Sequence, residues 1–275
     1  RSLVYFAAYC VLLASAVLII SNIRPASADL ATESPVGTPQ VNQANASITQ
    51  IVQVSTDAAT DWMLHTASEC AAGIPELALA TNTTSQTTQG KMVTNVDFQW
   101  GEPATSPGYA VVLGKSQLIF IVNPENPLVK LPLTQLEKIF DGTLTTWSDL
   151  LTSCPNCYNE PSAAELLDSL IQLYSYPADS DALVAFESHF TASPRVLNSA
   201  IIVPSTAAMN EAVLADPFAL GFLPAQAMDE EVVLVNLTES GESFEITLPL
   251  LAVTTSEPQG LAIEWLACVQ KDLAP

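Results

Sequence analysis

The stretch LIFIVNPENPLVKLPLTQLEKIFDGTLTTWSD, residues 118–149, places a strand, a turn and a helix in close succession. Leu118–Val122 is a β-branched and aromatic run that predicts a buried strand, and an Asn-Pro pair follows it. Thr134 then offers a side-chain cap for a helix over Gln135–Phe140, which an Asp-Gly pair closes. A strand that leads into a capped helix is typical of an α/β chain.

The same alternation of strand-like and helix-like segments extends to both sides of this stretch. It predicts an α/β fold, and no internal repeat is visible. We expect further strands at 51–54, 76–81, 93–100, 109–113, 201–203, 219–223, 232–235 and 244–253, and we expect the last two to pair around Gly241. We expect further helices at 58–72, 179–190, 205–214 and 260–272. The segment 166–173 is amphipathic.

Composition and charge limit the partners of the chain. Its 275 residues suffice for one large or two modest domains with real cores. There are 29 acidic and 8 basic side chains, which gives a formal net charge of -21. Binding to nucleic acid depends on Lys and Arg that neutralise phosphates, so we expect no nucleic-acid partner. An anionic membrane surface is disfavoured as a partner for the same reason. We expect the chain to be a monomer.

The N-terminal segment predicts export. Leu3–Ile20 is an unbroken run of apolar and small residues, and Ala26–Ala28 has the A-x-A pattern of a cleavage site. The run is also long enough to span a bilayer, so residues 1–28 are either a signal peptide or a membrane anchor. Both interpretations place the rest of the chain outside the cytoplasm, in the periplasm or at the cell surface. Residues 29–49 are polar and aperiodic, which predicts a flexible linker.

The chain has five cysteines, which suit an oxidising compartment. Cys10 lies inside the apolar run. Cys154 and Cys157 frame a C-P-N-C loop, for which we expect a local disulfide, and Cys70 and Cys268 are left as possible partners of each other. Neither histidine shows ligand spacing with the cysteines, so we expect no metal and no cofactor.

The quoted stretch resembles the phosphate-binding-protein (PstS-like) branch of the type II periplasmic substrate-binding proteins. That family shows an apolar strand that ends in Asn-Pro, a Leu-Thr helix start as at Leu133-Thr134, and an Ile-Phe-x-Gly-x-x-x-x-Trp turn as at Ile139–Trp147. The stretch DPFALGFLP at Asp216–Pro224 is similar to another segment of the family, and Leu248-Pro249-Leu250 also fits. The resemblance extends from about Ile51 to Leu273.

The resemblance implies two α/β lobes joined by hinge strands that close on a ligand. Lobe 1 would comprise residues 50–122 and 226–275, and lobe 2 would comprise residues 123–225. The family also implies an exported substrate-binding protein that delivers a small polar solute or oxyanion to an ABC-type permease. We expect no enzymatic activity, because no catalytic triad, nucleophile elbow or metal motif is visible in the sequence.

The resemblance also implies ligand-binding residues at strand ends and helix starts. Most of them carry hydroxyl groups, and one is a carboxylate that would accept a proton from a bound hydrogen phosphate. The implied residues are Ser55 and Thr56 at the first helix start, Thr84 or Ser85 in the second ligand loop, the carboxylate Glu102, and Ser180 at a third helix start.

One segment departs from the family. An Arg-x-x-Gly-Ser-Gly-Thr helix start is replaced by YPADSDA, in which Tyr176 stands for the arginine, Asp179 and Asp181 for the glycines, and Ala182 for the threonine. A bound phosphate would lose a charge-assisted partner and would face two carboxylates. We therefore expect a ligand other than free phosphate, and Tyr176 and Asp181 belong to the expected site.

Two hypotheses about function remain open at this point. In the first, the chain is a substrate-binding protein, and Asp179, Asp181 and Glu102 suit a cationic or hydroxyl-rich ligand. In the second, the binding pocket is degenerate, and the chain is a surface-tethered sensor or adhesion module. A hydrolase with paired carboxylates has the least support.

Overall fold

The computed structural model describes residues 49–81, 91–103, 108–159, 169–189 and 199–274. These residues form a mixed α/β fold with two lobes and six α-helices. The expected signal peptide or anchor, the linker and Cys10 lie outside the described residues. Among the residues that are described, no helix has the length and apolarity needed to cross a bilayer. The lobe boundaries given above remain predictions.

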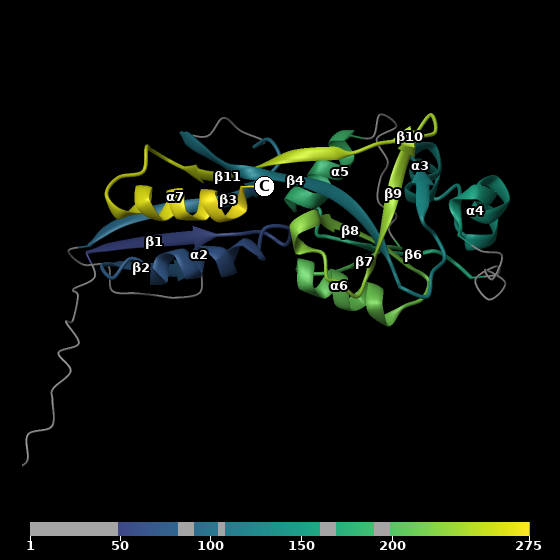
Figure 1. Ribbon diagram of the computed structural model, residues 1–275, viewed down its shortest axis with the longest axis horizontal. Helices are drawn as coiled ribbons and strands as arrows, with labels where there is room; N and C mark the ends of the chain where they lie inside the picture. Colours follow the sequence, from purple (N-terminus) through teal and green to yellow (C-terminus); the bar gives the residue numbers. More distant parts are fainter. Residues whose placement is uncertain (1–48, 82–90, 104–107, 160–168, 190–198, 275) are drawn as a thin grey trace, which may run out of the picture. The chain divides into compact units, whose positions relative to one another are not determined.

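The first lobe is built on a sheet in which parallel strands β2, β1 and β3 are followed by antiparallel β11. Helices α2 and α7 lie beside these strands (Figure 1). The Cys70–Cys268 disulfide joins these two helices, as expected from the sequence. The elements are β1 (Gln50–Ser55), α2 (Met63–Ala72), β2 (Leu77–Thr81), β3 (Met92–Trp100), β11 (Ile246–Thr254) and α7 (Leu261–Leu273).

Strand β4 (Tyr109–Val122) is shared by both lobes, as Figure 1 shows. Its first part pairs with β11 from Tyr109 to Leu118, and its last part, from Leu118 to Val122, pairs with β8 (Ala219–Pro224). The sequence predicted two separate strands here, and that prediction was wrong. The polar residues between them continue the ladder with β11, so the chain forms one strand of 14 residues.

The second lobe packs helices around β8, β6 and β7, which extend the sheet beyond β4. Its core is aromatic: Phe120, Phe140, Phe186 and Phe222 contact one another, and Tyr176 meets Phe222 edge to face. The elements are β5 (Lys130–Pro132), α3 (Leu133–Phe140), α4 (Trp147–Ser153), β6 (Gln172–Ser175), α5 (Asp181–His189), β7 (Ile201–Ile202), α6 (Thr206–Ala215) and β8 (Ala219–Pro224). Two strands from the segment predicted for lobe 1, β9 (Val233–Glu239) and β10 (Glu242–Ser243), lie beside them, because β9 pairs with β5 and with the end of β4.

One other local prediction needs correction. The predicted strand pair around Gly241 was wrong: β9 pairs instead with the short β10, and β11 pairs with β3 and β4. Within the amphipathic segment 166–173, of which residues 169–173 are described, Gln172 and Leu173 begin β6 and pair in parallel with Ala219 and Leu220 of β8.

The first predicted helix begins later than residue 58. Helix α2 begins at Met63, and residues 58–62 form turns. The side chain of Asp57 accepts hydrogen bonds from the backbone N–H groups of Ala59 and Thr60, as a helix cap does, but turns and not a regular helix follow it. The segment that follows β1 is therefore a tight turn stabilised by a carboxylate, and it leads directly to the candidate site.

Candidate functional site

The turn after β1 fixes the carboxylate of Asp57. Its Oδ1 atom accepts hydrogen bonds from the N–H of Ala59 at 2.8 Å and from the N–H and the hydroxyl of Thr60, both at 3.0 Å. The Thr60 hydroxyl also lies 3.2 Å from the carbonyl oxygen of Phe98 in β3. These contacts hold Asp57 at the end of the sheet with its second oxygen, Oδ2, directed away from its own turn.

That second oxygen contacts the start of helix α5. Asp57 Oδ2 accepts a hydrogen bond of 2.5 Å from the backbone N–H of Asp181, the first residue of α5. Ser180, which is buried, caps the same helix, because its Oγ accepts from the N–H of Leu183 at 3.2 Å. The free N–H groups and the dipole of a helix start attract anions. Here the attracted anion is a carboxylate of the protein itself.

The side chain of Asp181 contacts the first lobe. Its Oδ2 atom accepts from the backbone N–H of Trp100, at the end of β3, at 2.7 Å. Burial of Asp181 and repulsion from Asp57 raise the pKa of its carboxyl group to about 7, and repulsion from Asp97 adds to this, whereas the Trp100 hydrogen bond lowers it. The start of α5 thus combines two carboxylates, of which Asp181 holds its proton more strongly than an ordinary aspartate does.

A third carboxylate, Asp97, binds a residue that was expected to contact the ligand. Asp97 Oδ1 accepts from the Ser55 hydroxyl at 2.6 Å, and Oδ2 accepts from the Gln99 amide at 2.7 Å. Ser55 is therefore engaged within the first lobe. The neighbouring Thr56 is half-buried at the end of β1, and nothing in the structure connects it with a ligand.

Tyr176, which replaces the family's arginine, is fully buried. Its ring packs on Phe222, and its hydroxyl has no hydrogen-bond partner in the described part of the chain. Burial raises the pKa of this hydroxyl well above its usual value, and the nearby carboxylates of Asp61 and Asp57 raise it further. The hydroxyl therefore stays protonated and is available as a donor near those carboxylates.

A cavity of about 410 Å³ lies beside Asp181. Its walls come from the end of β3, from helix α5 and from β11. Glu102, which is exposed, lines this cavity together with Asp181, so the structure brings these two expected site residues together. The other lining residues are Trp100, Gly101, Val184, Ala185, Ser188, His189, Thr247, Leu248 and Pro249.

The remaining expected residues do not complete this site. Thr84 and Ser85 lie outside the described residues. Sequence interpretation did not single out Asp61 and Asp97. Asp97 alternates with the buried Val96 and Phe98 in β3, which is the pattern of an ordinary half-buried strand, so the sequence carries only a weak signal for it.

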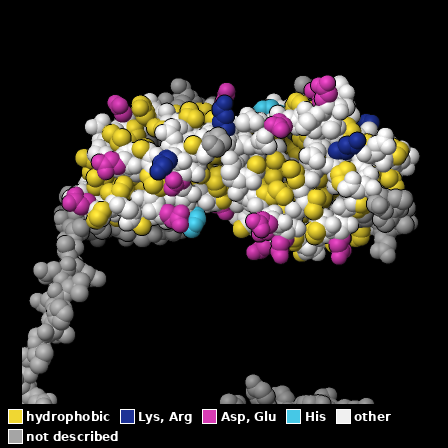
Figure 2. All heavy atoms as spheres, in the orientation of Figure 1, with side chains coloured by type: hydrophobic (Ala, Val, Ile, Leu, Met, Phe, Trp, Pro, Cys, Tyr) yellow, Lys and Arg dark blue, Asp and Glu magenta, His cyan; other side chains and the backbone are white. Residues whose placement is uncertain are grey.

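The surface is consistent with the acidic composition. Figure 2 shows acidic side chains on both halves of the visible face and few basic ones. Within the described ranges, the only ion pair is between His65 and Glu69, and both of these side chains are exposed. The carboxylates around α5 are therefore compensated by neutral N–H and O–H donors and not by Lys or Arg.

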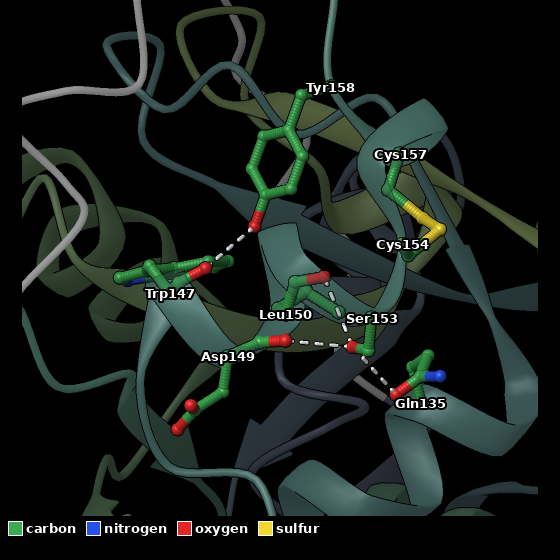
Figure 3. The surroundings of a disulfide bond; sticks show 8 residues. All are labelled: Gln135, Trp147, Asp149, Leu150, Ser153, Cys154, Cys157 and Tyr158. Carbon is green, nitrogen blue, oxygen red and sulfur yellow. Dashed lines mark hydrogen bonds between the residues drawn. A yellow bond between two sulfur atoms is a disulfide. The ribbon is translucent and has the colours of Figure 1, made fainter. Parts of the chain in front are cut away.

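The second disulfide lies in another part of the second lobe. Cys154 and Cys157 are bonded within a short 3-10 turn that follows α4, as Figure 3 shows. Cys157 is buried, and the Tyr158 hydroxyl donates to the carbonyl oxygen of Trp147 at 3.4 Å. None of these residues lines the cavity beside Asp181. The C-P-N-C motif is therefore a local structural link, as expected from the sequence.

Comparisons with known proteins agree with this architecture. A family model described as a PBP superfamily domain matches residues 105–265. An ABC-type phosphate transport receptor from Vibrio cholerae is similar with a TM-score of 0.54 and 19% identity, over 82% of this chain and 96% of that one. No curated protein sequence matches significantly.

Two further solved structures share the fold. A putative phosphate ABC transporter substrate-binding protein with bound phosphate, from Clostridium perfringens, has a TM-score of 0.60 at 15% identity, over 80% of this chain and 92% of that one. The CcmR regulatory domain of Synechocystis in complex with 2-PG has a TM-score of 0.50 at 12% identity, over 82% of this chain and 99% of that one. The fold thus occurs in both binding proteins and regulatory domains.

Proposed function

Because the chain belongs to the PBP superfamily, with a model that matches residues 105–265, we propose that it is an exported substrate-binding protein whose site does not hold free phosphate. The resemblance to PstS-like type II binding proteins is confirmed at the level of family and fold. Delivery of the solute to an ABC-type permease and a location outside the cytoplasm belong to the same proposal. The similar structures are binding proteins and regulatory domains, and we propose no enzymatic activity.

One observation carries the proposal: the carboxylate of Asp57 occupies the N–H of Asp181 at the start of α5. A phosphate that approached this helix start would have to displace that carboxylate. It would also approach Asp181, whose own carboxyl group takes the Trp100 N–H. Like charges at contact distance repel by several kcal/mol when water is partly excluded, on an order-of-magnitude estimate.

The lining of the adjacent cavity agrees with this argument. It contains the carboxylates of Glu102 and Asp181 but neither Lys nor Arg among its described residues. Contacts between arginine and phosphate are charge-assisted and often bidentate, which makes them stronger than neutral hydrogen bonds. The cavity therefore lacks the kind of contact that would bind an oxyanion most strongly. A buried tyrosine, Tyr176, stands at the position where the family resemblance implies an arginine.

The test is a thermal unfolding titration of the full chain with inorganic phosphate. A true ligand at about 100 times its Kd stabilises a protein by about 2.7 kcal/mol. We expect phosphate at millimolar concentration to leave the unfolding midpoint unchanged. Saturable stabilisation at micromolar phosphate would contradict the proposal.

A matched variant makes the negative result informative. Asp57→Asn combined with Asp181→Asn removes both negative charges and keeps the side-chain size. If the carboxylates exclude phosphate, this variant should gain a phosphate-dependent rise of the midpoint that the native chain lacks. A variant that folds and still ignores phosphate would show that the two charges are not what excludes it.

A second function is favoured by the same contacts. Asp57 and Asp181 satisfy the donors at the start of α5 without any solute. Such a site also suits a surface-tethered sensor or adhesion module with a degenerate pocket. A panel of oxyanions, amines, amino acids and sugars that leaves the midpoint unchanged throughout would favour this alternative over a substrate-binding protein.

A further inference from the structure

We propose that the cavity beside Asp181 and Glu102 binds an organic cation, namely an amine carried on a compact apolar body. This inference rests on the proposed function, because it names the class of solute for that same site. It goes beyond the exclusion of phosphate, since a site that rejects an anion need not bind a cation. Three features of the molecule support it.

The first feature is the chemistry of the cavity walls. Asp181 contributes a carboxylate from helix α5 and Glu102 one from the bend after β3, while Val184, Leu248 and Pro249 contribute apolar surface. The volume of about 410 Å³ lies in the usual range for small-molecule sites, which is about 300 to 1,000 Å³. Acidic groups combined with apolar walls match a ligand that has a charged amine and an apolar body.

The second feature is uncompensated negative charge. Asp57, Asp97 and Asp181 approach closely enough that Asp57 and Asp97 both raise the pKa of the Asp181 carboxyl group. Their hydrogen-bond donors are backbone N–H groups, hydroxyls and one amide, all of them neutral. A bound cation would reduce this repulsion, whereas a neutral solute would not.

The third feature is independent of the carboxylates themselves. The hydroxyl of Tyr176 is buried, and no partner for it exists in the described structure. Leaving a buried polar group unpaired costs roughly 1 to 3 kcal/mol. Asp57 lies close to this hydroxyl and bonds to the N–H of Asp181, so the unpaired group belongs to the same cluster. Tyr176 does not line the cavity itself, so this hydroxyl shows that the polar cluster behind Asp181 is incompletely satisfied.

The geometry favours an organic cation over a metal ion. In the described part of the chain, the only three ligand atoms that gather closely enough to hold a metal come from Cys70, Cys268 and Asp272. These two cysteines are bonded to each other in a disulfide and so provide no thiolate for a metal. The carboxylates near α5 are spaced more widely, as suits a larger cation that makes several separate contacts.

The test compares two probes that differ in charge but hardly in shape. Thermal unfolding and titration calorimetry of the full chain are measured with 2-phenylethylamine and with its neutral analogue 2-phenylethanol. At a pH above 7, where Asp181 is ionised, we expect the amine to raise the midpoint and the alcohol to leave it unchanged. Equal effects of both probes, or no effect of the amine at millimolar concentration, would overturn the inference.

Variants locate the effect at the cavity. Asp181→Asn should weaken amine binding at least tenfold, and Glu102→Gln should weaken it several-fold. Glu187→Gln is the matched control, because Glu187 is exposed on the same helix but does not line the cavity. If Glu187→Gln weakens binding as much as Asp181→Asn, the amine responds to general surface charge, and the inference is overturned.

Tyr176→Phe gives a separate readout. Removal of an unpaired hydroxyl should stabilise the free protein or leave it unchanged, while amine binding becomes weaker if the ligand completes the cluster. Phenylalanine preserves the ring contact with Phe222, so this variant should fold. Unchanged amine affinity in Tyr176→Phe would remove the hydroxyl from the site and overturn that part of the inference.

The outcomes separate this inference from the function on which it rests. Stabilisation by a sugar or an amino acid, without stabilisation by the amine, would overturn the cation class and leave a substrate-binding protein in place. Stabilisation by phosphate alone would overturn both proposals. Binding of the amine and not of phosphate supports both.

Discussion

Helices α5 and α6 begin with the same pattern of contacts but with different first residues. Each is preceded by a serine whose Oγ caps the helix, Ser180 for α5 and Ser205 for α6. Each then has a first residue whose N–H donates to an aspartate of the turn after β1. At α5 the pair is Asp181 and Asp57, and at α6 it is Thr206 and Asp61.

The difference lies in the side chain of the first residue. The hydroxyl of Thr206 donates to Asp61 at 2.8 Å, so it adds a second bond to the same carboxylate. Asp181 instead adds a second negative charge next to Asp57 and takes the N–H of Trp100. The comparison shows that a self-satisfied helix start needs no second acid. The carboxylate of Asp181 is therefore not needed to satisfy the start of its own helix; it accepts from Trp100, and the proposed cation site would use it as well.

The largest effect should come from removal of the carboxylate with the most donors. Asp57→Ala loses the bonds to Ala59, Thr60 and Asp181, and we expect it to lower the free energy of unfolding by about 2 to 3 kcal/mol. Urea denaturation measures this quantity. Glu230→Ala, at an exposed acidic residue, is the control and should change it by less than about 0.5 kcal/mol. An equal, small loss in both variants would show that Asp57 does not hold the start of α5.

The sequence predicts much of the fold, because its signals are local. The strand–helix alternation, the Ser180 cap and both disulfides are read from neighbouring residues and from cysteine count. Pairing between distant strands is not readable in this way, so the shared strand β4 and the partner of β11 were predicted wrongly.

The site was harder to predict than the fold. The sequence places three site residues in recognisable motif positions, namely Ser180, Asp181 and Glu102. The contacts that these side chains make in the site depend on residues from other segments of the chain. Asp57 is recognisable in sequence only as a possible cap, and nothing local shows that its second oxygen reaches Asp181, 124 residues further along the chain. The sequence alone therefore indicates an altered site without revealing what fills it.

A change of pH should alter the free energy of unfolding by an amount between the effects of the two aspartate-to-alanine variants at Asp57 and Asp61. The pKa of the Asp181 carboxyl group is raised from 3.8 to about 7 in the folded state, so the folded chain holds a proton that the unfolded chain releases. The contribution of Asp181 to stability is therefore greatest below pH 3.8, falls as the pH rises toward about 7, and is constant above that. We expect a decrease of about 2 kcal/mol across this interval, about half of what the full change in pKa represents, because solvent screens a partly exposed group.

Asp181→Asn isolates that contribution. The asparagine retains an acceptor for the N–H of Trp100 but does not titrate. The difference between native and variant unfolding free energies, measured in urea at a series of pH values, should change in this interval and be flat outside it. Carboxyl groups remote from Asp181 titrate alike in both proteins and cancel in the difference, which therefore reports Asp181 together with its coupling to Asp57 and Asp97. A difference that stays constant with pH would mean that Asp181 has an ordinary pKa.

The smallest effect is expected at α6, where the carboxylate has fewer donors and the first residue of the helix is not an acid. Asp61→Ala removes the bonds to the N–H and hydroxyl of Thr206, and it should lower the free energy of unfolding by about 1 kcal/mol. Ser205 still caps α6 through the N–H of Ala208, so the helix start keeps part of its stabilisation. Urea denaturation of Asp61→Ala beside Asp57→Ala compares the two helix starts directly. If Asp61→Ala proves as costly as Asp57→Ala, the two contacts are equivalent, and the second acid at α5 would need no separate role.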